Sequence, residues 1–79
     1  MNREDILKEI TEIVQDILGE EEIYLTEMST AKDIEGWDSL AHISILEAVQ
    51  SEYNVVFDLE EIIEMATVGD IITAVENKR

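Results

Sequence analysis

The residues best placed for covalent chemistry lie in the run Gly36-Trp37-Asp38-Ser39-Leu40. The acid and the serine stand after a glycine, where a helix is expected to begin. A serine hydroxyl in a first helical turn projects from the surface, where another enzyme can reach it. If it became a phosphodiester, the free N–H groups and the positive end of the helix would favour that anion. The competing interpretation is that Asp38 and Ser39 only cap the helix.

Catalysis by the chain alone has little support in the sequence. Its one histidine, His42, lies three residues after Ser39, but a nucleophile and a base also need an oxyanion site and an orienting third group. A small helical protein is expected to have little concave volume for such a site. We therefore expect His42 to be a solvated or loosely packed helix residue, and the protein to be non-catalytic.

Metal binding is not expected either. The chain has one histidine and no cysteine, which excludes zinc sites of ordinary composition. Aligning Gly36 with the sixth position of an EF-hand loop puts Ala31 and His42 at the first and twelfth positions, where calcium needs carboxylates. No metal site is predicted.

The length and composition indicate one small globular domain spanning residues 1–79. The 79 residues are 46% hydrophobic and 32% charged, which is too apolar for intrinsic disorder. No apolar stretch is long enough to cross a bilayer, and the first residues lack the basic and apolar regions of a secretory signal. We expect a monomer in the cytoplasm with no membrane insertion.

The charge is strongly acidic, with 20 acids against 5 Lys and Arg and a net charge of -15. Nucleic acid and anionic lipid surfaces are therefore poor partners, because phosphate binding needs clustered bases. Between Asp33 and Asn77 there are eleven acids and no Lys or Arg. This run of negative charge can serve to bind a basic partner protein or only to keep the protein soluble, and both interpretations stay open.

The first helix is expected between Asn2, as its N-cap, and Gly19, as its C′ residue. Its apolar stripe comprises Ile6, Leu7, Ile10, Ile13, Val14, Ile17 and Leu18. The helical spacing of apolar residues does not continue into residues 20–37. Their scattered apolar side chains (Ile23, Leu25, Met28 and Ile34) are expected to pin a long loop across the ends of the helices.

A second helix is expected from Asp38 or Ser39 to Asn54. Its inner stripe is predicted to comprise Leu40, Ile43, Leu46, Val49 and Tyr53, widened by Ala41, Ile45 and Ala48. Residues 55–57 suit an extended connector, Asp58 can cap a short third helix, and residues 67–70 have the shape of a capping box before the last helix. The predicted fold is all-α, a small four-helix bundle with three main helices, a short third helix and a long first loop.

This arrangement resembles the acyl carrier proteins over essentially the whole chain. The attachment motif of that family reads here as Asp38-Ser39-Leu40 at the start of the second helix. The later family pattern of an apolar-rich turn, a short acidic helix and a Thr-capped last helix matches residues 53–58 and 67–68. The three-residue motif alone is weak evidence for the family, but its position at the start of the second helix of this pattern makes the resemblance strong.

The resemblance implies that Ser39 receives 4′-phosphopantetheine from coenzyme A, transferred by a separate phosphopantetheinyl transferase with Mg²⁺. The terminal thiol of the arm then carries an acyl group as a thioester to partner enzymes, so the reactive sulfur belongs to the cofactor. Asp38 would help present the site to the transferase and its metal. Leu40 would contact partner enzymes, although its periodicity equally suits a core position.

The second helix departs from housekeeping fatty-acid carriers. Its only acids between Leu40 and Tyr53 are Glu47 and Glu52, and Trp37 stands where those carriers commonly have a small residue. The resemblance therefore favours a specialised carrier of a short acyl, aminoacyl or polyketide unit. Its expected partners are an acyl-adenylating ligase or acyltransferase that loads it and a downstream synthase or transferase that unloads it.

Partner enzymes are expected to bind a surface that comprises Trp37, Ala41, Glu47, Glu60, Glu61 and Glu64. Trp37 has a second interpretation, as an anchor that folds the long loop onto the core. For the whole chain, the alternative to a carrier is an acidic helical adaptor that binds a basic protein and in which Ser39 is only a helix cap.

Overall fold

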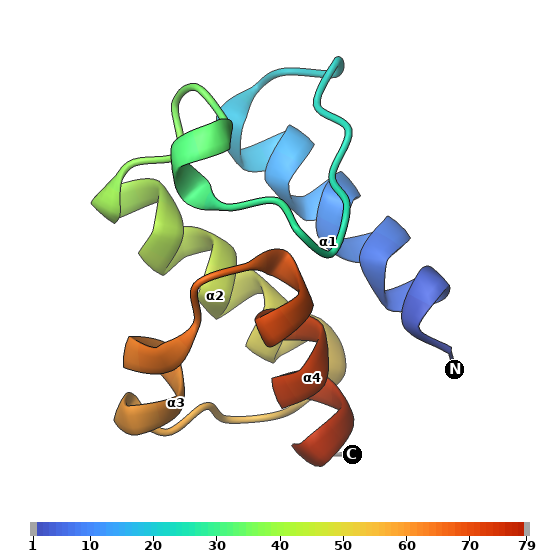
Figure 1. Cartoon of the computed structure of the whole chain (residues 1–79), viewed down its shortest axis with the longest axis vertical. Helices are drawn as coiled ribbons and strands as arrows, with labels where there is room; N and C mark the ends of the chain where they lie inside the picture. The colour runs from blue at the N-terminus through green and yellow to red at the C-terminus, as the bar shows by residue number, and fades with distance from the viewer. Residues whose placement is uncertain (1, 79) are drawn as a thin grey trace.

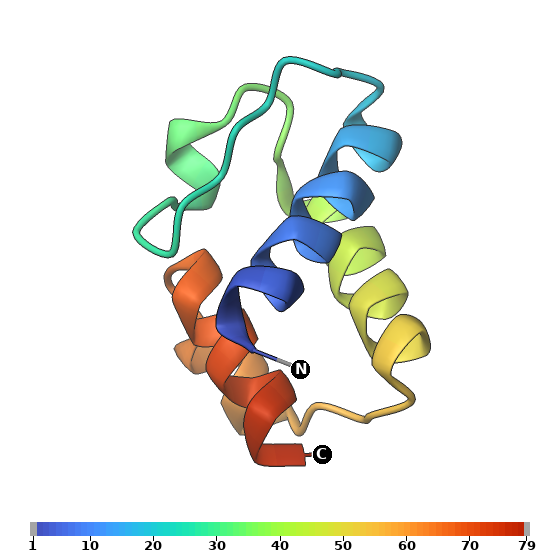
Figure 2. The same cartoon turned by 90° about the vertical axis from the view of Figure 1, so that its right-hand side faces the viewer.

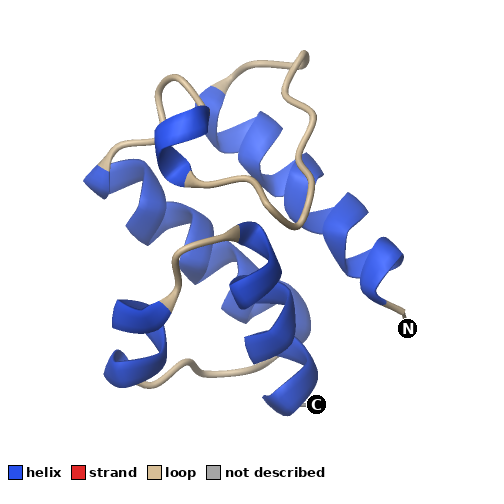
Figure 3. Cartoon of the chain, in the orientation of Figure 1, coloured by secondary structure: helices blue, strands red, loops and turns tan. Residues whose placement is uncertain are grey.

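The computed structural model describes residues 2–78, which form helices and loops and no strand (Figure 1, Figure 3). Four α-helices lie within that range: α1 Arg3–Leu18, α2 Ser39–Tyr53, α3 Leu59–Glu64 and α4 Val68–Lys78. A short 3-10 turn, η1 Ala31–Asp33, interrupts the long first loop and was not anticipated from the sequence. The prediction of three main helices, a short third helix and a long first loop is confirmed.

The ends of α1 and α2 follow the expected signals. The side chain of Asn2 accepts a hydrogen bond from the Asp5 N–H at 2.9 Å, so it caps α1 as predicted. Gly19 closes α1 in the left-handed region, at φ 67°. Asn54, at φ 55°, ends α2 in the same way.

Hydrogen bonds between side chain and backbone begin the two later helices. The Asp58 N–H donates to the Glu61 carboxylate at 2.8 Å at the start of α3. Before α4, the Thr67 N–H donates to the Asp70 carboxylate at 3.0 Å and the Asp70 N–H donates to the Thr67 hydroxyl at 3.2 Å. The predicted capping box with Asp in place of Glu is therefore present.

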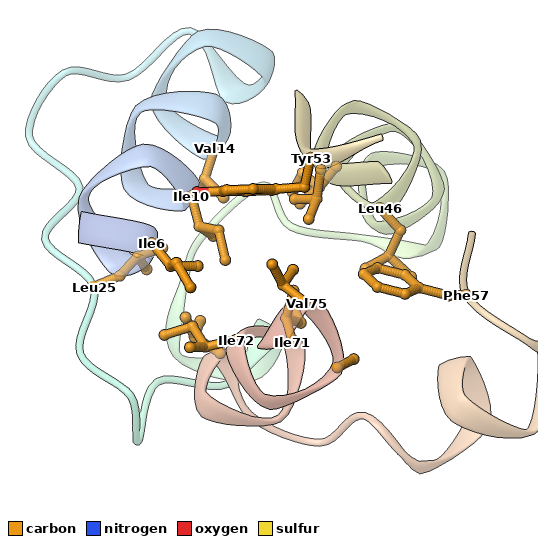
Figure 4. Packing of buried hydrophobic residues seen from close by; sticks show 14 of the residues in the cluster. Ile6, Ile10, Val14, Leu25, Leu46, Tyr53, Phe57, Ile71, Ile72 and Val75 are labelled. Carbon is orange, nitrogen blue, oxygen red and sulfur yellow. The ribbon is translucent and has the colours of Figure 1, made fainter. Parts of the chain in front are cut away.

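The core lies between α1, α2 and α4. Figure 4 shows side chains of α1 and α4 pointing toward each other, with Tyr53 and Leu46 of α2 closing the third side. The innermost residues, each at most 2% exposed, are Ile6, Ile10, Val14, Ile45, Val49, Val68, Ile71, Ile72 and Val75. Burying such side chains stabilises the fold by about 1.5–3 kcal/mol each.

The predicted inner stripe of α2 is wrong at its first two positions. Leu40 and Ile43 are 78% and 55% exposed, and the buried residues are Ile45, Leu46, Val49 and Tyr53. Apolar residues surround most of this helix, so a spacing counted from Leu40 could not single out the buried side. The core interpretation of Leu40 is thereby excluded.

The long loop is pinned as predicted by Ile23 and Leu25, whose side chains are buried, whereas Met28 is 78% exposed. The loop also reaches the start of α4, as the two views of the chain show (Figure 1, Figure 2). There the N–H of Val68 donates to the Ser29 carbonyl at 2.9 Å and that of Gly69 donates to the Glu27 carbonyl at 2.8 Å. These bonds attach the loop to α4.

Arg3 connects α1 to the same junction. Its guanidinium forms an ion pair with Glu27 at 2.6 Å, a second one with Glu76, and donates to the Gly69 carbonyl at 3.2 Å. The hydrogen bonds from Arg3 hold the pKa of the Glu27 carboxyl below its usual value. One cation thus holds α1, the loop and α4 together.

The segment after α2 is the expected extended connector. Val55 and Phe57 are buried, while Val56 between them is 75% exposed. The Phe57 N–H donates to the Gln50 side chain at 2.8 Å. α3 then lies at the rim, with Leu59 and Ile63 exposed. Among the described residues, no helix is both long enough and apolar enough to cross a membrane.

Candidate functional site

At the start of α2, the side chains of Asp38 and Ser39 have different roles. Asp38 is the N-cap: its carboxylate accepts a hydrogen bond from the Ala41 N–H at 2.9 Å. Ser39 is exposed, and its hydroxyl makes no hydrogen bond with any of residues 2–78. Asp38 therefore supplies the cap, and the hydroxyl of Ser39 is left accessible.

A tight turn before the helix creates this exposure. Gly36 has φ 91°, a conformation that L side chains rarely adopt, and its carbonyl accepts from the Asp38 N–H at 3.0 Å. The turn sends the Trp37 side chain inward, where it is 7% exposed. The position of Trp37 in the core is that of a loop anchor rather than of an exposed contact.

A cavity of about 520 Å³ lies beside Ser39. It is bounded by the loop before η1, the first turns of α2 and the segment that leads into α4. Its lining residues include Thr30, Trp37, Asp38, Ser39, His42 and Met65. The expectation of little concave volume is wrong, because the long loop and the segment before α4 border this hollow together with α2, although it stays partly open to solvent.

His42 is held by Trp37. The Trp37 indole Nε1–H donates to His42 Nδ1 at 3.0 Å, and the two ring centroids are 6.0 Å apart. Partial burial of the imidazole lowers the pKa of His42. His42 is therefore half-buried and bonded, and the prediction of a loosely packed residue missed this contact. The available signal was spacing, since Trp37 and His42 occupy the N′ and N4 positions of a hydrophobic staple.

The residues expected to bind partners have different surroundings. Leu40 is exposed directly beside Ser39, while Ala41 is half-buried. Glu47, on α2, and Glu60 and Glu64, on α3, are exposed. Glu61 is engaged within the protein, because it accepts from the Asp58 N–H and forms an ion pair with Lys78 at 2.9 Å. Across residues 2–78, no three His, Asp or Glu side chains gather closely enough to hold a metal ion.

Comparison with known proteins agrees with this geometry. The family model described as "Phosphopantetheine attachment site" matches residues 8–75. The chain is 32% identical over 77 residues to the acyl carrier protein of Thermotoga maritima, which covers 98% of this chain and 95% of that protein. The chain belongs to the acyl carrier protein family.

A solved structure supports the same assignment. The solution NMR structure of holo acyl carrier protein from Geobacter metallireducens matches with a TM-score of 0.85 and 32% identity, over 92% of this chain and 84% of that one. The chain described here is thus a carrier of acyl groups on a phosphopantetheine prosthetic group, and it acts with partner enzymes. The adaptor alternative is not favoured.

The chemistry of the site fits that group. A phosphodiester link needs a hydroxyl that is exposed and free to lose its hydrogen, and Ser39 meets both conditions. The first turn of the 15-residue helix α2 suits a phosphate, because its backbone N–H groups point outward there.

Proposed function

We propose that Ser39 is the residue to which phosphopantetheine is attached. The observation that carries this proposal is the division between Asp38, which caps α2, and Ser39, whose exposed hydroxyl has no partner within residues 2–78. The other serines on α2, Ser44 and Ser51, are exposed on later turns, away from the cavity and from the first-turn N–H groups.

Attachment forms one bond and breaks one bond. The Ser39 oxygen attacks the phosphorus that bears the pantetheine arm in coenzyme A, and the bridging bond to the second phosphate breaks. Adenosine bisphosphate leaves with the bridging oxygen, and the serine proton passes to a base on the transferase. In this proposal Asp38 contributes a carboxylate beside the reacting hydroxyl, where the Mg²⁺ of the transferase needs oxygen ligands. The attached arm supplies the thiol that forms the thioester.

The carrier is proposed to serve a specialised pathway that moves a short acyl, aminoacyl or polyketide unit. The sparse acids of α2 support this, since Glu47 and Glu52 alone interrupt its uncharged surface. We assign loading to an acyl-adenylating ligase or an acyltransferase and unloading to a synthase or transferase. The chain itself is proposed to be a non-catalytic, cytoplasmic monomer.

Partner enzymes are proposed to dock on the exposed residues around the arm. Leu40 offers an apolar contact beside Ser39, and Glu60 and Glu64 offer charges on α3. Exposed charges act mainly on the rate of association, so a basic partner surface would be steered to this side of the molecule.

Intact mass tests the attachment site. The protein is incubated with coenzyme A, Mg²⁺ and a promiscuous phosphopantetheinyl transferase, and its mass is expected to rise by one arm. Ser39→Ala should abolish the gain and keep the far-UV circular dichroism, because Asp38 still caps α2. Ser44→Ala is the matched control and should gain one arm. A gain that survives Ser39→Ala would overturn the assignment.

A further inference from the structure

We propose that His42 binds the phosphate of the arm on Ser39 through its Nε2–H, and that Trp37 positions His42 for this contact. The inference rests on the proposed attachment at Ser39. It assigns a binding role to the one histidine of the sequence and a positioning role to the one tryptophan.

The tautomer of His42 follows from its contact with Trp37. Because the indole N–H can only donate, the atom that it meets, His42 Nδ1, must be the acceptor and carries no hydrogen. In the neutral ring the hydrogen then lies on Nε2. That donor has no hydrogen-bond partner among residues 2–78. Trp37 thus fixes both the ring and its free donor.

The position of His42 places this donor near the attachment point. His42 and Ser39 are three residues apart on α2, so their side chains are neighbours on one face of the helix. Both line the 520 Å³ cavity, together with Trp37. The phosphate is the first group of the arm beyond the serine oxygen, so it is the part of the arm that must lie within one helical turn of His42.

Among the residues that line the cavity, His42 is the only one whose side chain can become positive, and Lys32, next to the lining residue Ala31, is exposed on η1. Between Asp33 and Asn77 there is no Lys or Arg, so His42 is the only side chain of that stretch that can become positive. Asp38 is the only carboxylate among the residues that line the cavity, and it lies on the same turn as Ser39. A hydrogen bond from His42 to the phosphate would offset the repulsion from Asp38.

Attachment of the arm should therefore change the titration of His42. Partial burial lowers the pKa of the ring in the unmodified protein. A phosphate within hydrogen-bond reach stabilises the protonated ring, so proton affinity should rise by about tenfold on modification. Protonation also removes the acceptor at Nδ1, so the bond from Trp37 must break as the ring becomes charged.

Phosphorus NMR gives a direct test, because a phosphodiester lacks the second ionisation that a phosphomonoester has near about pH 6. In the modified protein, we expect the ³¹P resonance to move with pH and to share its midpoint with the His42 ring. The Trp37 indole N–H resonance should move at the same midpoint. The Nε2-bound hydrogen of His42 should exchange more slowly with water in the modified than in the unmodified protein.

Two variants make the assignment specific. His42→Gln keeps a helix-forming residue without a titrating ring, and its ³¹P resonance should be independent of pH. The double variant His42→Gln/Ser51→His keeps one histidine on α2 but places it twelve residues from Ser39, about 18 Å along the helix. Its ³¹P resonance should also be flat. Far-UV circular dichroism checks that both variants are folded.

The results separate this inference from the proposed attachment. If the protein gains no arm at Ser39, the attachment fails and the phosphate contact fails with it. If the arm is attached but the wild-type ³¹P resonance does not move with pH, only the role of His42 is overturned. If the ³¹P resonance of His42→Gln still moved with pH at the same midpoint, the role of His42 would also be overturned, because another group would be responsible.

Discussion

The backbone N–H of Gly69 donates to the carbonyl oxygen of Glu27 at 2.8 Å, which brings the long loop against the first turn of α4. A Cβ added at Gly69 would lie 2.9 Å from that carbonyl oxygen and 3.3 Å from the Glu27 Cβ. The loop that leads toward Ser39 is therefore held by an approach that only glycine permits.

Gly69→Ala should destabilise the protein, although alanine is the better helix former by about 1 kcal/mol. The added methyl group meets a backbone atom that cannot rotate away, and such overpacking costs about 1–3 kcal/mol. Because a backbone atom cannot give way, we take the upper part of that range, about 2–3 kcal/mol, and after the gain in propensity expect a net loss of about 1–2 kcal/mol in the free energy of unfolding by urea denaturation. Ser44→Ala, at an exposed position of α2, controls for helix propensity. A Gly69→Ala protein as stable as wild type would show that the loop can move away without loss.

Acidification should remove the contribution of Asp70. Hydrogen bonds from the Ala66 and Thr67 N–H groups hold the pKa of this carboxyl below the ordinary aspartate value of 3.8. Because the folded value is the lower one, the stabilisation is present above pH 3.8 and is lost as the pH falls through the folded pKa. Asp70→Asn should therefore be less stable than wild type near pH 6, and the difference in Tm should close below about pH 4. A constant difference across this range would mean that the charge of Asp70 does not stabilise α4.

Salt should stabilise the protein. The net charge of -15 includes eleven acids in a stretch without Lys or Arg, and mutual repulsion of this kind is screened by ions. We expect the Tm near neutral pH to rise with NaCl and to rise further with Mg²⁺ at equal ionic strength. The ion pairs of Arg3 and Lys78 are weakened by the same salt but involve few charges. A Tm that is flat or falls would mean that these pairs outweigh the repulsion.

The acids of α3 should divide into two groups. Glu60 and Glu64 are exposed, so Glu60→Gln/Glu64→Gln should slow loading by the cognate enzyme several-fold at low salt. The Tm of this variant should not fall and should rise slightly, because two mutually repelling charges are removed. Glu61→Gln should lower the Tm, because Glu61 accepts from the Asp58 N–H and binds Lys78. The hydrogen bond from Asp58 lowers the pKa of Glu61, which is the sign of a carboxylate that favours the folded state.

Loading kinetics and thermal melts of the two variants distinguish these roles. Glu52→Gln, on α2, is a control for the removal of an exposed acid outside α3. Unchanged loading of Glu60→Gln/Glu64→Gln at low ionic strength would indicate that partners dock mainly on the exposed apolar side chains, Leu40 among them.

Local sequence signals were enough to predict the helices. The features that the predictions missed depend on contacts between residues far apart in the sequence. Asn2, Gly19, Asn54 and the Thr67–Asp70 pair act within a few residues of their own position, so their roles can be recognised from spacing. The buried face of α2 depends instead on where α1 and α4 lie. A helix that is apolar around most of its surface does not reveal which side those neighbours cover.

For the candidate site, the sequence likewise predicted the local features and missed the long-range ones. Asp38 and Ser39 were recognisable as a helix start, because capping is a local property. The cavity depends on two segments far apart in sequence, the loop near Thr30 and the segment around Met65, and no local pattern predicts their meeting. The contact between Trp37 and His42 was within reach of sequence reasoning, since the two residues are five positions apart.

Because Asp38 caps α2, folding of the chain does not depend on its modification. No bond that holds α2 together involves the hydroxyl of Ser39, so the polypeptide can reach its native state before any enzyme modifies it. With Ser39 as the proposed attachment residue, the modifying enzyme would act on a chain that is already folded.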